Sequence, residues 1–186
     1  SNFKKESVVF VCDNYFENKS FLPDDKLYKL IKNYKSLFLD GGVGSKNLSE
    51  LTKIWSFFNE NKLSRDGCII ALGGGVIGDL CGLAASMYHR GVSLIHVPTT
   101  LTSAVDSAIG GKTGVNMYET VNLLGTYYHP IATFIDLRFM KTLDKRDFAS
   151  GVAESIKKSF IYDKDFYNFI LNNSNKIFQR EINSLY

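Results

Sequence analysis

The sequence predicts an α/β protein with a doubly wound, mostly parallel sheet, followed by the start of an all-helical C-terminal domain. Apolar runs of strand length alternate with helically periodic segments as far as about residue 140, and only helical patterns follow. Three consecutive glycines in mid-chain join one such strand to one such helix. We expect a sheet domain over residues 1–144 and an incomplete helical domain over residues 145–186, whose short helices offer little surface for a separate core.

The first third of the chain predicts two strands and two helices. Residues 7–12 are a continuous apolar run that ends at Asp13, and parallel sheets place their ligands at such strand ends. Apolar residues at i, i+3 and i+4 predict an amphipathic helix over residues 24–34, and residues 36–40 predict a second strand. A glycine loop then leads to the helical stripe of residues 48–61.

The third strand, residues 68–72, ends in a glycine-rich turn. Gly73, Gly75 and Gly78 have the spacing G-x-G-x-x-G, and a helix is predicted over about residues 76–88. Glycines at this spacing allow a tight turn and let backbone amides approach a pyrophosphate, as in Rossmann-like folds. The motif alone fits equally well with a plain sharp turn between two core elements.

Later segments continue the alternation. Residues 92–97 predict a strand, and the hydroxyl-rich residues 99–103 can cap the segment that follows. Residues 110–114 resemble the end of a phosphate loop at first sight. We reject that interpretation, because Asp106 stands where the Walker spacing needs a glycine. Residues 131–135 predict the last strand, which ends at an aspartate.

Two helices are predicted from Lys145 onward, the second over residues 165–172. On the first, Glu154 and Lys157 are i and i+3 and share a face. They fit a functional pair or an ordinary surface ion pair, which is worth only a few tenths of a kcal/mol. The three histidines show no metal-ligand spacing, and His96 fits a core position in its strand.

Composition narrows the class of protein. The chain has 186 residues, of which 45% are hydrophobic and 22% charged, with a net charge of +3 and no basic stripe, so we expect a globular protein that binds no nucleic acid. A membrane span over residues 67–85 is rejected, because an unpaired Asp79 at the bilayer centre would cost about 3 kcal/mol or more. Three cysteines in apolar stretches and no signal peptide indicate a reduced, cytoplasmic protein.

Four polar residues stand among glycines and small residues at predicted loop positions: Arg90, Asp106, Lys112 and Asn122. Lys112 lies beside a glycine, where its ammonium can reach a phosphate or carboxylate. The alternative is that Lys112 is an exposed turn lysine and Asp106 a helix cap. These residues alone do not decide between the two.

Four longer segments occur in a fixed order: GGGVIGDLCGLAASMYHRG at residues 73–91, PTTLTSAVDSAIGGKTGVN at 98–116, NLLGTYYHP at 122–130 and LDKRDFASGVAESIK at 143–157. Together they resemble the dehydroquinate synthase family of the sugar phosphate cyclase superfamily. The resemblance implies an NAD-dependent lyase of the shikimate pathway that eliminates phosphate from a heptulosonate phosphate and closes the ring. It also implies a homodimer and a divalent metal, zinc or cobalt, that polarises a substrate oxygen.

The resemblance assigns roles residue by residue. The implied cofactor-binding positions are Asp13, Lys46, Gly74, Gly75, Val76, Asp79, Thr99, Thr100, Asp106, Phe139 and Thr142. The implied substrate-binding or catalytic positions are Asp106, Lys112, Asn122 and Lys157, together with Arg90, which would reach its site across the dimer interface. Glu154 corresponds to one metal ligand.

The chain also departs from the family pattern. Val121 replaces a lysine, the loop over residues 40–46 lacks a glutamate, Asp144 replaces a proline, and residues 102–104 differ from the commoner Leu-Ala-Gln. The resemblance places the two histidine metal ligands beyond Tyr186. We therefore expect a truncated chain or a fragment that is inactive by itself and holds no metal tightly.

Three other functions stay open from the sequence. The change at Val121 keeps open another sugar phosphate cyclase that makes a cyclitol or valiolone-type ring. A metal-dependent polyol dehydrogenase would release NADH instead of recycling it. The missing histidines leave room for a non-catalytic remnant that binds NAD.

Overall fold

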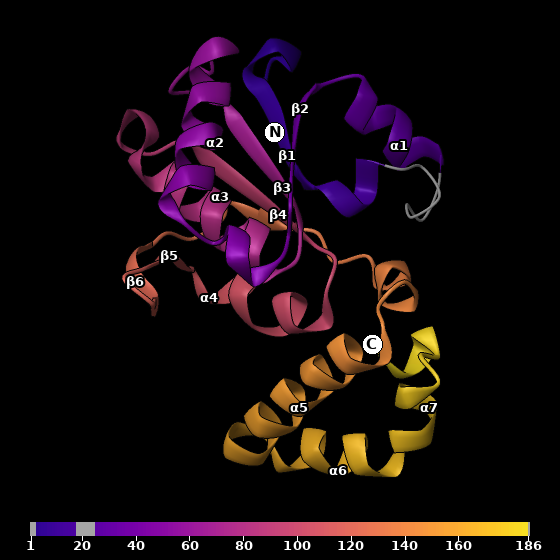
Figure 1. Ribbon diagram of the computed structural model, residues 1–186. Helices are drawn as coiled ribbons and strands as arrows, with labels where there is room; N and C mark the ends of the chain where they lie inside the picture. The colour runs from indigo at the N-terminus through magenta and orange to yellow at the C-terminus, as the bar shows by residue number, and fades with distance from the viewer. Residues whose placement is uncertain (1–2, 18–24, 186) are drawn as a thin grey trace.

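The computed structural model describes residues 3–17 and 25–185 (Figure 1). A parallel sheet organises the first part of the chain. Its strands, in the spatial order β2-β1-β3-β4-β7, are β2 (Lys35–Leu39), β1 (Val8–Asp13), β3 (Cys68–Gly73), β4 (Ser93–Pro98) and β7 (Ala132–Thr133). All four pairings in this sheet are parallel, which confirms the predicted doubly wound architecture.

Helices cover both faces of the sheet. Figure 1 shows α2 (Leu48–Glu60) and α3 (Gly75–Met87) on one face and α1 (Asp25–Lys32) on the other. Val9 and Val11 of β1 belong to the hydrophobic cluster under α2 and α3, whereas Phe10 belongs to the cluster on the opposite face. Consecutive strand residues point to opposite faces, so a strand buried on both is apolar throughout. The first residue of the predicted helix over 24–34 lies outside the described residues.

The predicted loop positions of Lys112 and Asn122 are wrong. These residues lie in an antiparallel hairpin of β5 (Lys112–Met117) and β6 (Thr120–Tyr127). Every residue of β6 is exposed, so the strand has no apolar alternation that a sequence pattern could detect. The hairpin packs on α3 at Gly82, where an added Cβ would lie 2.4 Å from Thr113 Cγ2.

The last predicted strand is shorter than expected, because only Ala132 and Thr133 of residues 131–135 pair with β4. Elsewhere, Thr100 Oγ1 accepts a hydrogen bond from the Ser103 backbone N–H at 3.2 Å, which confirms the expected cap. Short helical turns complete the sheet domain: η1 (Lys5–Ser7), η2 (Asn14–Glu17), η4 (Val43–Ser45), η5 (Tyr88–Arg90), the π-helical η6 (Ser103–Ser107), α4 (Ala108–Gly110) and η7 (Leu137–Lys141).

The C-terminal region is helical, as predicted. It contains α5 (Lys145–Tyr162), α6 (Lys164–Asn172), α7 (Ser174–Phe178) and the turn η8 (Ile182–Ser184). The Asp144 side chain caps α5 by accepting the Asp147 backbone N–H at 2.7 Å, a function that a proline at this position would not perform. Phe148 and Val152 share one hydrophobic cluster with sheet residues, so the first helix is packed on the sheet domain's own core. A domain boundary after residue 144 stays a prediction.

Cys12, Cys68 and Cys81 are free, buried thiols. Burial raises the pKa of Cys68 to about 11 and that of Cys12 to about 12. In the part of the chain that the structure describes, no helix is long and apolar enough to cross a membrane.

The close crossing of α5 over the chain at Leu101 generates the first testable prediction. A Cβ at Gly151 would lie 2.4 Å from Leu101 Cβ and 2.8 Å from the Thr102 backbone nitrogen. We expect Gly151→Ala to lower the free energy of unfolding by about 1–3 kcal/mol, because neither neighbour can give way. Gly110→Ala is the control, since nothing lies within 4 Å of its added Cβ. Urea denaturation measures both, and equal stability of the two variants would contradict the crossing.

Candidate functional site

The glycine turn between β3 and α3 lies at the carboxyl edge of the sheet. Gly74 is the N-cap of α3 and Gly75 its first residue, so the first amides of a 13-residue helix point outward there. An added Cβ at Gly73 would lie 2.7 Å from Ile77 Cβ, which is why the turn needs glycine at that position. A helix N-terminus of this kind attracts phosphate through its free amides and its dipole.

Lys46, Asp79 and Asn122 form a cluster that joins three separate segments. The Lys46 Nζ donates to Asp79 Oδ2 and to Asn122 Oδ1, and the lysine is only 8% exposed. The Lys46 backbone carbonyl accepts the Asn116 N–H at 2.8 Å, and the Asn122 N–H bonds Asn116 Oδ1 at 2.9 Å. Asn122 has a φ of 56°, a left-handed conformation that asparagine tolerates better than most residues. The structure therefore brings two predicted cofactor residues together with one predicted substrate residue.

Burial sets the electrostatics of Asp79. It raises the pKa of this carboxyl above its ordinary value, and the hydrogen bond and charge of Lys46 oppose that shift. The charged carboxylate is thus held in a buried place by one ammonium. Loss of that ammonium would leave an uncompensated charge.

A polar pocket of about 470 Å³ opens between α3, η6 and the hairpin. Its charged and amide groups are Asp79, Asp106, Lys112 and Asn122, so three residues predicted to bind substrate do meet in space. The remaining lining is Ser107, Gly110, Thr113, Leu123, Gly125, Thr126 and Tyr127. These residues lie in the segments that carry the family resemblance, but the sequence assigned them no role, and most belong to the hairpin that it did not reveal.

Two lysines on α5 pair with carboxylates near this pocket. Lys158 Nζ donates to Asp106 Oδ1 at 2.8 Å, and Lys157 Nζ donates to Glu154 Oε2 at 2.6 Å. The hydrogen bond from Lys158 lowers the pKa of Asp106, with smaller contributions from the charges of Lys158, Lys112 and Lys157. The bond to Glu154 raises the pKa of Lys157. Lys158 had no predicted role, and sequence spacing gave no signal for it.

An acidic pocket of about 410 Å³ lies beyond the other side of the glycine turn, where β1, β2 and β4 end. It contains four predicted cofactor residues, Asp13, Thr99, Thr100 and Thr142, together with the unpredicted Asp40. Burial is the main cause that raises the pKa of Asp13; the nearby Asp40 charge adds to the shift, and the Tyr15 backbone N–H opposes it. The pocket is completed by Asn14, Tyr15, Phe16, Gly41, Gly42, Leu143, Asp144 and Asp147.

The glycine turn connects the two pockets. An added Cβ at Gly74 would lie 3.1 Å from Thr100 Cγ2 on the acidic side, and one at Gly75 would lie 3.5 Å from Ser107 Oγ on the polar side. An extended ligand could therefore place one end in each pocket and a pyrophosphate at the turn. These residues fit a dinucleotide.

Two predicted residues lie elsewhere. Phe139 is fully buried against Phe16, so its side chain is a core group that does not line the polar or acidic pocket. Arg90 follows the last turn of α3, away from the glycine turn at its start, and it is exposed. That Arg90 serves a site on another subunit stays a prediction.

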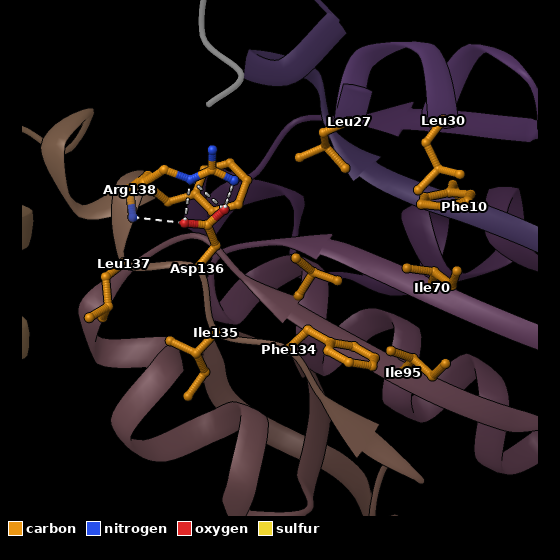
Figure 2. Close-up of a pocket in the computed structure, with 12 residues that line it drawn as sticks. Phe10, Leu27, Leu30, Ile70, Ile95, Phe134, Ile135, Asp136, Leu137 and Arg138 are labelled. Atoms are coloured by element: carbon orange, nitrogen blue, oxygen red, sulfur yellow. Dashed lines mark hydrogen bonds and ion pairs between the residues drawn. The ribbon is translucent and has the colours of Figure 1, made fainter. Parts of the chain in front are cut away.

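A third pocket lies on the sheet face that carries α1, and it is mostly apolar. Figure 2 shows Phe10, Ile70, Ile95 and Phe134 facing it. Its charged lining residues are Asp136 and Arg138, and Arg138 Nη2 lies 2.6 Å from Asp136 Oδ2 in an ion pair. Apart from Phe139, no predicted site residue lines this pocket.

The residues that the structure describes do not form a metal site. Within residues 3–17 and 25–185, no three His, Cys, Asp or Glu side chains gather as metal ligands would. Glu154, the predicted ligand, is bonded to Lys157. One carboxylate falls short of the roughly three protein ligands of a catalytic zinc.

The chain is similar in sequence to 3-dehydroquinate synthases. A sequence model described as "3-dehydroquinate synthase N-terminal" matches residues 36–150. A 3-dehydroquinate synthase of Buchnera aphidicola subsp. Cinara cedri is 41% identical over 94% of the chain and 48% of its own length. The chain thus spans about half the length of the curated relatives it matches.

Two solved structures extend the comparison. A 2-epi-5-epi-valiolone synthase from Streptomyces hygroscopicus subsp. jinggangensis, with NAD⁺ and Zn²⁺ bound, has a TM-score of 0.84 and 29% identity over 94% of this chain and 49% of its own. A 2-deoxy-scyllo-inosose synthase in complex with carbaglucose-6-phosphate, NAD⁺ and Co²⁺ has a TM-score of 0.68 and 31% identity over 83% of this chain and 43% of its own.

The buried Lys46–Asp79 pair generates the second testable prediction. We expect Lys46→Met to lower the free energy of unfolding by about 2–4 kcal/mol at neutral pH, because Asp79 keeps an uncompensated buried charge. The double variant Lys46→Met with Asp79→Leu should recover at least half of that loss, since the charge is gone.

The same pair predicts a pH dependence. The pKa of Asp79 is raised by burial, so the unpaired carboxyl takes up a proton as the pH falls. The destabilisation by Lys46→Met should therefore shrink from about pH 8 to about pH 5. Urea denaturation at several pH values measures it, and a constant difference would show that Asp79 is not the buried charge.

Proposed function

The chain belongs to the 3-dehydroquinate synthase family, and on that premise we propose that the protein is an NAD-dependent 3-dehydroquinate synthase. The reaction is a phosphate elimination from a seven-carbon heptulosonate phosphate, followed by ring closure to dehydroquinate. The observation that carries the proposal is the polar pocket beside the start of α3, where Asp106, Lys112 and Asn122 converge. Family membership covers residues 36–150, so the activity of the whole protein is part of the proposal.

NAD is the cofactor that the two connected pockets support. The adenosine end would bind among Asp13, Thr99, Thr100 and Thr142, and the pyrophosphate would bind the amides at Gly74 and Gly75. Gly75, Val76 and Asp79 would contact the next part of the cofactor, which would extend from the glycine turn to the polar pocket. When bound, NAD supplies a hydride acceptor that oxidises a ring hydroxyl and later returns the hydride.

The polar pocket supplies the groups that handle the sugar phosphate. Lys112 is exposed at the start of β5, and its ammonium can neutralise the charge that grows on the leaving phosphate as the carbon–oxygen bond breaks. The Asp106 carboxylate can accept hydrogen bonds from ring hydroxyls, and the Asn122 amide can orient another. Lys157 on α5 adds a second cation from the helical side.

The proposal includes a homodimer, a cytoplasmic location and a divalent metal. Arg90 is exposed in a turn with a φ of 64°, at the end of α3, which supports a homodimer in which it enters the partner's site. Three buried, unpaired thiols support a reducing, cytoplasmic location. A divalent metal, zinc or cobalt, would need ligands besides Glu154, which the family resemblance places beyond Tyr186, and we assign no step to it.

A second candidate is another sugar phosphate cyclase. The change at Val121 does not by itself favour it, because this side chain is 66% exposed on β6 and does not line the polar pocket, whose lysine is Lys112. The 2-epi-5-epi-valiolone synthase with a TM-score of 0.84 supports this alternative. An NAD-binding remnant without turnover is the outcome if neither substrate reacts.

Phosphate release in the longest native form of the protein tests the proposed function. With NAD and cobalt or zinc supplied, we expect phosphate and dehydroquinate to appear together without net NADH. Lys112→Ala should abolish phosphate release and change the NAD dissociation constant by less than about threefold, because Lys112 acts on the substrate anion. Lys145→Ala is the matched control. Activity near that of the wild type in Lys112→Ala would remove Lys112 from the site.

Val121→Lys separates the two candidate substrates. If the protein is a dehydroquinate synthase that tolerates valine, the added lysine should change kcat/KM for the heptulosonate phosphate by less than about tenfold. A protein that releases phosphate only after this substitution would instead have another natural substrate. Steady-state assays with heptulosonate and heptulose phosphates measure both outcomes.

A further inference from the structure

Lys158 connects the helical region to the wall of the polar pocket. It follows Glu154 by one turn on α5, and its Nζ donates to the Val105 backbone carbonyl at 2.7 Å and to Asp106 Oδ1 at 2.8 Å. Both acceptors belong to the π-helical turn η6 (Ser103–Ser107). One ammonium therefore binds the main chain and the functional side chain of the same turn.

The turn that Lys158 binds is an uncommon one. A π-helical turn is rare in proteins and is retained where surrounding contacts support it, often at functional sites. Thr100 caps the segment before it, and Ser107 Oγ bonds Ser103 Oγ at 3.1 Å across it. After it, Thr133 Oγ1 donates to the Ala108 carbonyl at 2.9 Å. Lys158 is the charged side chain that supports the turn from α5.

The surrounding charges show why this contact matters for the pocket. Asp106 is influenced by Lys158, Lys112 and Lys157, and its own charge acts on Asp79. Lys157 is bonded to Glu154, which also lies 4.0 Å from Lys158. Among the described residues Lys112 has no ion pair, and its charge helps to lower the pKa of Asp106, whose bonded partner is Lys158.

We propose that Lys158 is a positioning residue for the sugar phosphate, which it serves by holding η6 and the Asp106 carboxylate at the edge of the polar pocket. The proposal rests on the proposed function for the identity of the ligand. Asp106, held in this way, accepts hydroxyl groups of the substrate, and Lys112 stays available for its phosphate. The family resemblance assigned roles to Glu154 and Lys157 on this helix and none to Lys158.

Three variants of the longest native form test this role: Lys158→Met, Lys158→Arg and Lys145→Met. Lys145 is an exposed lysine at the start of the same helix, and it has no ion pair in the part of the chain that is described. Two quantities are measured. One is the steady-state kinetics of phosphate release at saturating NAD, and the other is amide hydrogen exchange over residues 101–110 by mass spectrometry.

We expect Lys158→Met to raise the KM for the sugar phosphate about tenfold while kcat falls less than about threefold, because the lysine acts on substrate binding through Asp106. Lys158→Arg keeps a positive group with several donors and should bring the KM to within about threefold of the wild type. Exchange over residues 101–110 should be at least about fivefold faster in Lys158→Met, and unchanged in Lys145→Met.

Several results would overturn the inference. These are an unchanged KM or unchanged exchange in Lys158→Met, a loss confined to kcat, no rescue by arginine, or an equal effect of Lys145→Met. If the wild type releases no phosphate from the heptulosonate phosphate, the proposed function fails instead. Hydrogen exchange then decides alone whether Lys158 holds the turn, and equal protection in wild type and Lys158→Met rejects it.

Discussion

Burial of α3 is the constraint on which the rest of the structure depends. The helix is apolar almost all round, and eight of its residues from Ile77 to Ala85 are buried. Such a helix must be covered on every side. The sheet covers one side, α2 another, and the β5–β6 hairpin a third, with Gly82 allowing the close approach of Thr113. The hairpin that hides α3 from water is also the element that carries Lys112 and Asn122 to the start of that helix.

The single charged residue of α3 extends this arrangement into the site. Asp79 lies one turn from the glycine turn, and its burial requires a cation close by. Lys46 supplies it from a loop far away in sequence and also binds Asn122 on the hairpin. The same contacts that compensate a buried charge thus connect α3, which starts at the glycine turn, with the hairpin that lines the polar pocket. The cluster of Lys46, Asp79 and Asn122 therefore serves both stability and the shape of the pocket.

The contacts between α5 and the rest of the chain also serve both packing and the polar pocket. Gly151 lets α5 cross close to Leu101, and Lys158 reaches the π-helical turn that carries Asp106. The helices therefore contribute to the pocket without forming a core of their own, since Phe148 and Val152 join the cluster of the sheet domain. This sharing agrees with a chain that spans about half the length of its relatives. The polar pocket itself opens between α3, η6 and the hairpin, and α5 reaches its wall through the bond from Lys158 to Asp106.

The sequence by itself determined the strand–turn–helix order, the parallel sheet and the family, because apolar periodicity and glycine spacing are local properties of the chain. Through that resemblance it also pointed to Asp106, Lys112 and Asn122 as neighbours. The sequence did not predict the hairpin, because β6 is exposed on both faces and has no alternation of apolar and polar residues. Only the tertiary structure decided that Lys46 pairs with Asp79, that Phe139 is a core residue and that Lys158 binds Asp106. Those contacts join residues distant in sequence, and a one-dimensional pattern contains no information on such distances.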